Sequence, residues 1–456
     1  MQDLTQGSVS RHLVKTASFM LVTMVFQTLY FLTDLYWVGR LGKEAVAAVG
    51  VAGNLQFIVL AISQMLGVGA TTLVSHAAGQ RDQARAVLLF NQSQILSVIV
   101  GGAFLLVAMA LRPWYALALS ADAPTAARTA EYLLWFVPAM ALQFAIVAMA
   151  AALRGVGNFK PGMIVQTATV IINLVLSPVL IFGWATGSPM GVAGAAVATL
   201  VAVFIGVAWL TRYFLPRDAY LRFVRRDMRP QFPLWRHMLR IGLPAGAEFA
   251  LMAVYLFLVY RIAAPFGSAA QAGFGIGMRV VQALFMPVIA LGFSVAPVAG
   301  QNVGARLGAR VRAVFRSGCL MAGSAMFAAA ILCNIAPAAL VGVFSVDARV
   351  IAVGEEYLRI TSWNFVASGL IFVASSMFQA LGNTLPALLA SFCRLALIAV
   401  PLLLLARLPT YELRWIWYLS VAAIFVQLGI ISLLLRREFR LKLDAHRVAT
   451  VGASAV

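Results

Sequence analysis

The sequence predicts an all-α integral membrane protein of twelve transmembrane helices in two six-helix bundles, and three observations carry this prediction. Of the 456 residues, 62% are hydrophobic and 11% are charged, and the mean hydropathy is +0.93. Soluble domains carry about 25% charged residues. The apolar residues gather in twelve runs, each close to the ~20 residues that a helix needs to cross the hydrocarbon core. The first half of the sequence also repeats in the second half.

The twelve apolar runs fall into two groups of six. They lie near 14–38, 46–74, 88–111, 130–153, 162–183, 190–211, 238–263, 268–299, 314–336, 356–380, 385–406 and 414–435. They are too long and unbroken for barrel strands of about 10 alternating residues. The first run is too long for the apolar part of a signal peptide, and no small-residue cleavage site follows it. We therefore expect it to remain as the first helix.

The repeat appears when the sequence is shifted by 225 residues, which aligns the halves without gaps. Arginine, Glu-Tyr-Leu and Gly-Asn-x-x-Pro matches at one offset exclude chance pairing of alanine-rich stretches. The matched pairs include Gly42/Gly267, Arg81/Arg306, Arg85/Arg310, Asp122/Asp347, Tyr132/Tyr357 and Asn158/Asn383. Because each half has six spans, both halves enter and leave on the same side, so the repeat is parallel. Substrates of such folds bind between the halves near the midplane.

The basic residues predict the orientation and the domain division. We expect an N-lobe over 1–211, a basic linker over 212–240 and a C-lobe over 241–456. The net charge is +19, and alternate loops with both termini hold 23 Lys and Arg, whereas the other loops hold 9. The positive-inside rule then places both termini and the linker in the cytoplasm, as in a multi-pass protein of the cell inner (plasma) membrane. Topology accounts for the charge, so we expect no nucleic-acid partner.

Two carboxyl groups lie inside the apolar runs rather than in their first residues, Asp34 in the first run and Glu248 in the seventh. A charge at the bilayer centre costs roughly 2.5–3.5 kcal/mol on insertion scales, and such residues usually bind a cation or proton or hold a partner. One such residue in each half indicates an ion-coupled transporter. Structural alternatives stay open, since Asp34 can bond to neighbouring helices. Glu248 closely follows Pro244, where its charge would favour a helix start.

Four short motifs, in their order and spacing, resemble the multidrug and toxic compound extrusion (MATE) family. The segment Asp34-Leu-Tyr-Trp-Val-Gly-Arg-Leu-Gly42 is similar to the family's first-helix Asp followed by Val-Gly-x-Leu-Gly. The stretch from Gly67 to Gly79 resembles the end of the second helix, and Arg154-Gly-x-Gly-Asn158 the exit of the fourth. Gly242-Leu-Pro244 resembles the start of the seventh. The resemblance covers nearly the whole chain.

The resemblance implies a cation-coupled antiporter that moves amphipathic, often cationic, drugs or metabolites outward in exchange for protons or sodium. It places Asp34 in a hydrogen-bonded cavity with Tyr30, one turn earlier, and Asn173 on the fifth helix. Thr199 is a candidate partner on the sixth helix. Some members carry a second Asp one turn after the fifth-helix Asn, where this chain has Ser177. Asp34 is therefore the one carboxylate expected in this ion-coupling site.

A substrate cavity is expected around Glu248 in the C-lobe. Members with a C-lobe Glu often place it one turn later, where this chain has Met252. Met278 and Phe285 are further candidates, because methionine adapts to varied ligands and aromatic faces attract organic cations. Gln282 lies on an apolar face, where interhelical hydrogen bonding is the default and cavity lining the alternative. The expected partners are small organic cations or amphipathic molecules and the lipid bilayer.

Proton coupling is favoured over sodium coupling by the composition of the expected site. Hard cations such as sodium prefer several oxygen ligands with carboxylates supplying charge, and the site offers one carboxylate among neutral groups. We expect H⁺, with Na⁺ as the alternative, no other cofactor, no metal site, no catalytic residue and a monomer. A lipid-linked precursor flippase of the same exporter superfamily would show a wider, more cationic cavity. A membrane-embedded enzyme would need a polar catalytic cluster, which the sequence lacks, so we expect no enzyme.

Overall fold

The computed structural model describes residues 1–184, 187–405 and 412–444, and these residues form helices and no strand. The α-helices are α1 (Val9–Gly39), α2 (Lys43–Gly53), α3 (Leu55–Gly79), α4 (Gln83–Leu119), α5 (Ala123–Gly155), α6 (Lys160–Phe182), α7 (Gly191–Tyr213), α8 (Phe232–Ala263), α9 (Ser268–Gly304), α10 (Gly308–Ile335), α11 (Pro337–Gly342), α12 (Ala348–Thr361), α13 (Phe365–Ala380), α14 (Leu385–Leu405) and α15 (Arg414–Phe439). Short 3₁₀ turns cover Arg225–Met228, Ala264–Phe266 and Ser362–Asn364, and a π-helical turn covers Arg440–Asp444. Within the described residues, twelve helical spans are long and apolar enough to cross a membrane, with α2 joined to α3 and α12 to α13. The predicted all-α, twelve-span fold is confirmed.

The connecting turns repeat their backbone conformation from one half to the other. Arg81 and Arg306 both adopt left-handed conformations, with φ of 58° and 59°. Non-glycine residues rarely enter this region. Gly157 and Gly382 likewise share positive φ values of 78° and 70°. The sequence repeat is thus also a repeat of local structure.

Repeated aspartates begin corresponding helices. Oδ1 of Asp122 accepts a hydrogen bond of 2.8 Å from the amide of Thr125 at the start of α5. Oδ1 of Asp347 accepts one of 2.8 Å from the amide of Arg349 at the start of α12. Such caps satisfy amide groups that have no partner within the helix. The shared capping role explains why the sequence repeat has Asp at both positions.

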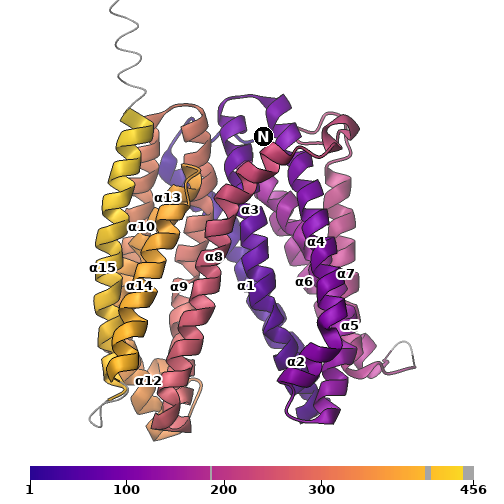
Figure 1. Ribbon diagram of the computed structural model, residues 1–456, viewed down its shortest axis with the longest axis vertical. Coiled ribbons are helices and arrows are strands. Elements are labelled where there is room, and N and C mark those ends of the chain that lie inside the picture. The colour runs from indigo at the N-terminus through magenta and orange to yellow at the C-terminus, as the bar shows by residue number, and fades with distance from the viewer. Residues whose placement is uncertain (185–186, 406–411, 445–456) are drawn as a thin grey trace, which may run out of the picture. The chain divides into compact units, whose positions relative to one another are not determined.

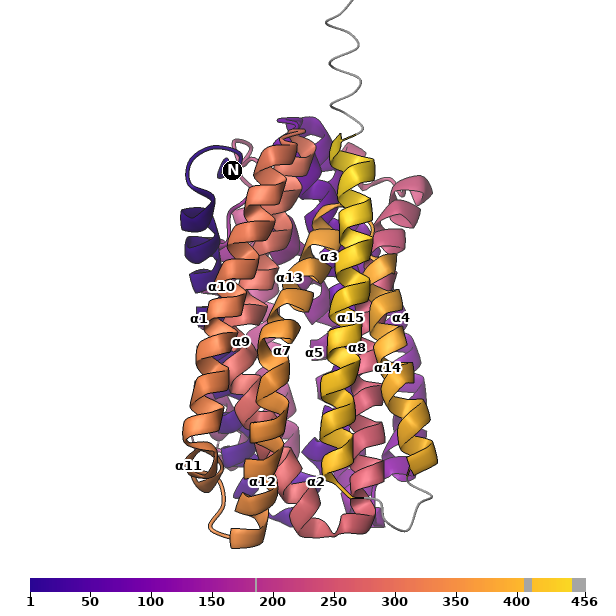
Figure 2. The ribbon, with the colours of Figure 1, turned by 90° about the vertical axis from the view of Figure 1, so that its left-hand side faces the viewer.

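The chain forms two compact units. Unit 1 contains residues Met1–Asp3 and Ser18–Gly246, and unit 2 contains Leu4–Ala17 and the described residues from Ala247 onward. The long helices run beside one another within each unit (Figure 1). Figure 2 shows α10, α13, α14 and α15 of unit 2 side by side. The units differ from the expected lobes in two segments. Residues 4–17, expected in the N-lobe, pack with unit 2, and residues 241–246, expected in the C-lobe, pack with unit 1 together with the linker 212–240.

The linker is held on unit 1 by two buried amide side chains of α4. Nδ2 of Asn91 donates to the carbonyl of Arg222 at 2.9 Å. Nε2 of Gln92 donates to the carbonyl of Asp227 at 2.6 Å, and its Oε1 accepts from the amide of Gln231 at 3.0 Å. The linker backbone at these residues is not α-helical, so its polar groups need partners outside an α-helix. The side chains of Asn91 and Gln92 supply them.

Two glycines then bring the first part of α8 against α3. A Cβ at Gly242 would clash with the carbonyl oxygen of Met65, and a Cβ at Gly246 would lie 2.6 Å from the carbonyl oxygen of Ala61. Small residues let membrane helices approach closely. This contact explains why α8 joins unit 1 as far as Gly246.

The N-terminal segment is held on unit 2 in a similar way. The amide of Leu4 donates to Oε1 of Gln301 at 3.0 Å, and Nδ2 of Asn302 donates to the carbonyl of Leu4 at 3.2 Å. The guanidinium of Arg310 donates to the carbonyl of Gly7 at 3.1 Å and to Oδ1 of Asn302 at 3.1 Å. The segment before the first helix of each repeat is therefore fixed by polar side chains.

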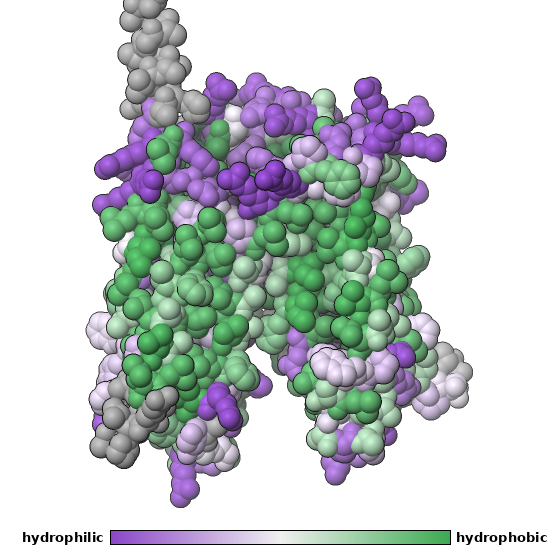
Figure 3. All heavy atoms as spheres, viewed as in Figure 1, coloured by the Kyte–Doolittle hydropathy of each residue, from purple (hydrophilic) through white to green (hydrophobic). Residues whose placement is uncertain are grey.

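The surface of each unit matches a membrane location. Hydrophobic side chains cover the middle of each unit in the view of Figure 3, and hydrophilic side chains gather toward its ends. Lipid offers no hydrogen bonds to the backbone, and a helix meets this requirement by bonding its polar groups within the segment. The predicted multi-pass membrane class is thereby supported by both composition and surface.

Candidate functional site

In unit 1 the four expected partners of Asp34 form one hydrogen-bonded chain. The hydroxyl groups of Tyr30 on α1 and Thr199 on α7 lie 3.0 Å apart. Nδ2 of Asn173 on α6 donates to Oγ1 of Thr199 at 3.0 Å. The hydroxyl of Ser177, one turn further along α6, donates to Oδ1 of Asn173 at 3.3 Å. The structure thus brings together residues from α1, α6 and α7 that the sequence places far apart.

The direction of the Tyr30 bond follows from the proton of Thr199. The hydroxyl of Thr199 donates to the carbonyl of Ala195 one turn earlier, at 3.1 Å. A hydroxyl has one proton to donate, so Thr199 must accept from Tyr30. The phenol of Tyr30 is then a donor to α7, and its oxygen remains able to accept a hydrogen bond.

Asp34 lies beside this chain on the same face of α1 as Tyr30. Its side chain is buried, with 8% exposure. Its Oδ1 atom is fully buried and has no hydrogen-bond partner among the described residues. Buried polar groups almost always have a partner, and a buried charge without one is costly. The unit therefore holds a carboxyl group whose neighbours are bonded to each other.

A further residue near Asp34 was not predicted. Tyr132 on α5 is 2% exposed and close enough to Asp34 and Tyr30 to interact electrostatically with both. Its ring stacks on Phe136 with 5.0 Å between centroids. The sequence distinguishes Tyr132 from other tyrosines only by its place in the repeated Glu-Tyr-Leu triplet.

In unit 2 Glu248 receives hydrogen bonds directly. Oε1 of Glu248 on α8 accepts from the hydroxyl of Ser391 on α14 at 3.0 Å and from the hydroxyl of Ser375 on α13 at 3.2 Å. Nε2 of Gln427 on α15 donates to the hydroxyl of Ser391 at 3.1 Å. Arg394, one turn beyond Ser391, interacts electrostatically with Glu248. Four helices therefore contribute to this site. Pairing of Arg394 with Glu248 is one of the roles that its charge in an apolar run suggests, whereas Ser375, Ser391 and Gln427 were not predicted.

The repeat relates the surroundings of the two carboxyl groups but not the groups themselves. Tyr30 corresponds to Tyr255, whose hydroxyl lies 3.2 Å from that of Ser420 on α15. Glu248, however, corresponds to Thr23. Thr23 precedes Asp34 by about three helical turns, or ~16 Å at 1.5 Å per residue. The two acids thus occupy different levels of equivalent helices.

The other residues expected at a substrate cavity do not form one cluster with Glu248. Met252 is 53% exposed, and Gln282 is exposed as well. The Sδ atom of Met278 accepts from the hydroxyl of Tyr357 at 2.9 Å. Phe285 packs edge-on against Phe372, with 5.9 Å between ring centroids. Met278 and Phe285 are thus engaged with α12 and α13, whereas Met252 and Gln282 present free surface.

The donors around Asp34 suit a proton or a single monovalent cation. Within the part of the chain that the structure describes, no three His, Cys, Asp or Glu side chains gather to hold a metal ion. The Asp34 surroundings offer one carboxylate and neutral oxygens from Tyr30, Thr199, Ser177 and Asn173. Such a set can exchange a proton, and it can hold an ion with low charge.

Comparison with known proteins gives relatives along nearly the whole chain. The probable multidrug resistance protein YoeA of Bacillus subtilis (strain 168) is 26% identical over 426 residues, which is 90% of both chains. The multidrug export protein MepA of Staphylococcus aureus is 24% identical and covers 94% of both chains. A solved structure of a multidrug resistance MATE family transporter of the MOP superfamily, in an outward-facing conformation, matches with a TM-score of 0.88 at 23% identity. That match covers 96% of this chain and 97% of the other, and it shows a shared fold.

The family itself follows from a match to most of the sequence. The MatE family model matches residues 20–179 and 244–405, one segment in each half of the repeat. The matched segments contain Asp34 with its chain partners on α6, and Glu248 with Ser375 and Ser391. The chain belongs to the MatE family of membrane transporters and is not an enzyme.

Proposed function

We propose that this protein is a proton-coupled antiporter that exports amphipathic, often cationic, organic compounds. The observation that carries the proposal is the buried Oδ1 atom of Asp34, which has no hydrogen-bond partner among the described residues. The surrounding chain of Tyr30, Thr199, Asn173 and Ser177 is bonded internally. A bound proton would remove the uncompensated charge.

The proton on Asp34 would control the link between α1 and α7. In the protonated form, the carboxyl can donate to the phenol oxygen of Tyr30, while Tyr30 keeps its bond to Thr199. In the charged form, the carboxylate competes with Thr199 for the proton of Tyr30, and hydrogen bonds to charged acceptors are roughly twice as strong as neutral ones. Proton loss would therefore loosen the bond between α1 and α7, whose atoms lie 3.0 Å apart. Coupling requires that the proton bind with different affinity to the two conformations of the transporter. A bond between α1 and α7 that depends on the proton can provide this difference.

The substrate class rests on the relatives and on Glu248. YoeA and MepA carry the names of multidrug resistance and multidrug export proteins. Glu248 is partly exposed, and its Oε1 is held by Ser375 and Ser391, so it can face a cationic ligand without losing its protein bonds. Met252, with 53% exposure, lies one turn further along α8 and would offer an adaptable apolar contact.

The remaining features of the proposal follow from topology. We propose that the linker, both termini and the basic end of each unit lie in the cytoplasm, and the excess of basic residues in alternate loops supports this orientation. Export then runs out of the cell across the inner membrane. We expect the protein to act as a monomer, as the family resemblance suggests.

Transport in proteoliposomes with imposed gradients tests the proposal. An outward-directed substrate flux should run on a pH gradient in sodium-free buffer and slow when an ionophore collapses that gradient. Strict dependence on Na⁺ with indifference to pH would instead make the oxygens around Asp34 a sodium site. Movement of lipid-linked precursors, without any effect of either gradient on organic cations, would favour a flippase.

A further inference from the structure

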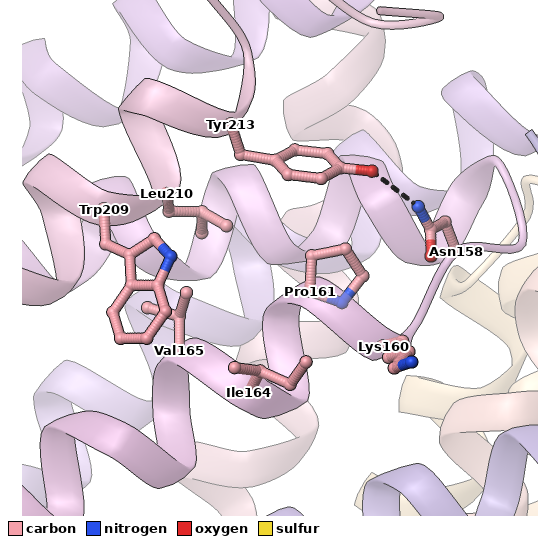
Figure 4. A pocket seen from close by; sticks show the side chains of 8 residues that line it. All are labelled: Asn158, Lys160, Pro161, Ile164, Val165, Trp209, Leu210 and Tyr213. Atoms are coloured by element: carbon pink, nitrogen blue, oxygen red, sulfur yellow. Dashed lines mark hydrogen bonds between the residues drawn. The ribbon is translucent and has the colours of Figure 1, made fainter.

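Unit 1 contains a cavity of about 370 Å³ where α6 begins and α7 ends, next to the basic linker. The residues around it are Asn158, Lys160, Pro161, Ile164, Val165, Trp209, Leu210 and Tyr213. Figure 4 shows Trp209 and Lys160 on opposite sides of this space, with Pro161 and Ile164 between them. None of these residues belongs to the Asp34 site.

The lining is apolar on one side and polar on the other. Trp209 is 48% exposed and Ile164 is 39% exposed, so both present apolar surface toward lipid. On the polar side, Nδ2 of Asn158 donates to the hydroxyl of Tyr213 at 2.8 Å. Lys160 is exposed beside this pair, and none of the ion pairs among the described residues involves it. Tryptophan and tyrosine are typical of the membrane–water interface.

The repeat shows how the same position is closed in unit 2. Asn158 and Tyr213 correspond to Asn383 and Glu438. Nδ2 of Asn383 donates to Oε1 of Glu438 at 3.1 Å. The ammonium of Lys442 then pairs with Glu438 at 3.0 Å and donates to the carbonyl of Leu381 at 2.7 Å. In unit 2 a carboxylate and a lysine therefore neutralise each other.

In unit 1 that neutralisation is missing. A phenol, Tyr213, stands in place of the carboxylate of Glu438, and the cation is Lys160 from the start of α6. The α7 helix ends at Tyr213, whereas its counterpart α15 continues into the turn that carries Lys442. The cavity thus holds a lysine that forms no ion pair with any described residue, and two neutral polar groups, next to an apolar groove.

We propose that this cavity binds an anionic phospholipid. The phosphate would pair with Lys160 and accept a hydrogen bond from the hydroxyl of Tyr213, which itself accepts from Nδ2 of Asn158. An acyl chain would lie along Ile164 and Trp209. An anionic lipid matches both the charge and the apolar side, whereas a zwitterionic lipid brings a cation to the same lysine.

Native mass spectrometry of the full protein with defined lipids tests this proposal. The protein would be equilibrated with phosphatidylglycerol and phosphatidylethanolamine of identical acyl chains. Wild-type protein should retain phosphatidylglycerol preferentially. Lys160→Ala should reduce that preference about fivefold, the factor expected for one lysine near an anionic surface. Lys43→Ala, the same change at an exposed lysine that starts α2, should leave the preference unchanged.

A second measurement needs no variant. Phosphatidylglycerol with a photoreactive acyl chain should cross-link to peptides containing 160–165 and 209–213. Equal retention of the two lipids by wild-type protein, or cross-links confined to other helices, would overturn the proposal. Displacement of the lipid by free glycerol phosphate at the same concentration would also overturn it, since the site would then recognise a soluble anion. If Lys160→Ala retains the wild-type preference for phosphatidylglycerol, then Lys160 does not bind the phosphate and the proposal is wrong.

Discussion

In unit 1 Asp34 lies beside a chain of hydrogen bonds whose members are bonded to one another, whereas in unit 2 Glu248 ends a chain of donors that point toward it. Oδ1 of Asp34 has no partner among the described residues. Oε1 of Glu248 accepts from both Ser375 and Ser391, and Arg394 is near enough to interact with it electrostatically. One carboxyl group is thus poorly supported as an anion, and the other is well supported.

The difference arises although the two halves share a repeated plan. Tyr30 and Tyr255 occupy equivalent positions, and each meets a hydroxyl of the last helix in its repeat, Thr199 or Ser420. Asp34 and Glu248, by contrast, lie at different positions along equivalent helices and have different hydrogen-bond donors around them. Duplication therefore preserved the helix contacts while the two halves acquired different chemistry. We infer that Asp34 carries the proton and that Glu248 acts on substrate recognition.

The largest expected effect is that of Asp34→Asn. The amide keeps the shape and hydrogen bonding of the side chain but cannot exchange a proton. Efflux driven by a pH gradient should fall to the level of protein-free liposomes, while expression is kept. Asp218→Asn, the same change at an exposed linker residue, should transport normally. Normal gradient-driven efflux by Asp34→Asn would show that Asp34 does not carry the coupled proton.

A smaller effect is expected for Tyr30→Phe, which removes the donor to Thr199 and keeps the ring. One neutral hydrogen bond contributes about 0.5–1.5 kcal/mol, so the efflux rate should fall roughly two- to tenfold. Tyr255→Phe removes the equivalent hydroxyl in unit 2 and should change proton-driven transport less. If Tyr255→Phe has the larger effect on the pH dependence of efflux, then the coupling site lies in unit 2.

Glu248→Gln should weaken the export of some cations more than others. The glutamine keeps an oxygen that can accept from Ser375 and Ser391 but loses the charge that attracts a cationic substrate. Efflux assays with cations of different size and with one neutral amphipathic compound would measure this selectivity. Uniform loss for every substrate, the neutral one included, would make Glu248 a second coupling site.

The smallest effect is expected at a helix cap outside the membrane. Hydrogen bonds from the hydroxyl and amide of Thr125 hold the pKa of Asp122 below its ordinary value. A lowered pKa in the folded state contributes stability above the unfolded pKa of about 3.9, and this is lost as the pH falls through the folded value. Thermal melting in detergent should show a lower Tm for Asp122→Ala at pH 7, with the gap narrowing only below about pH 4. Proton-coupled transport should be retained, which separates stability from coupling.

Much of the fold and of the N-lobe site could be predicted from the sequence. Twelve apolar runs and a constant offset define the helices, and the family resemblance names Tyr30, Asn173 and Thr199 before their contacts are known. The partners of Glu248 could not be found in this way, because Ser375 and Ser391 are ordinary residues of apolar helices until packing brings them together. The packing of 4–17 with unit 2, and of the linker and 241–246 with unit 1, was equally hidden. It depends on Gln301, Gln92 and Gly242, whose partners lie far away in the sequence.

The proton released when substrate binds tests the central claim most directly. Purified protein in weakly buffered solution would be titrated with a cationic substrate while the pH is recorded. Wild-type protein should release protons, and so should Glu248→Gln once substrate is raised to saturation. Asp34→Asn should release none, although it still binds substrate. Proton release from Asp34→Asn at the wild-type level, or its loss in Glu248→Gln at saturating substrate, would contradict this claim.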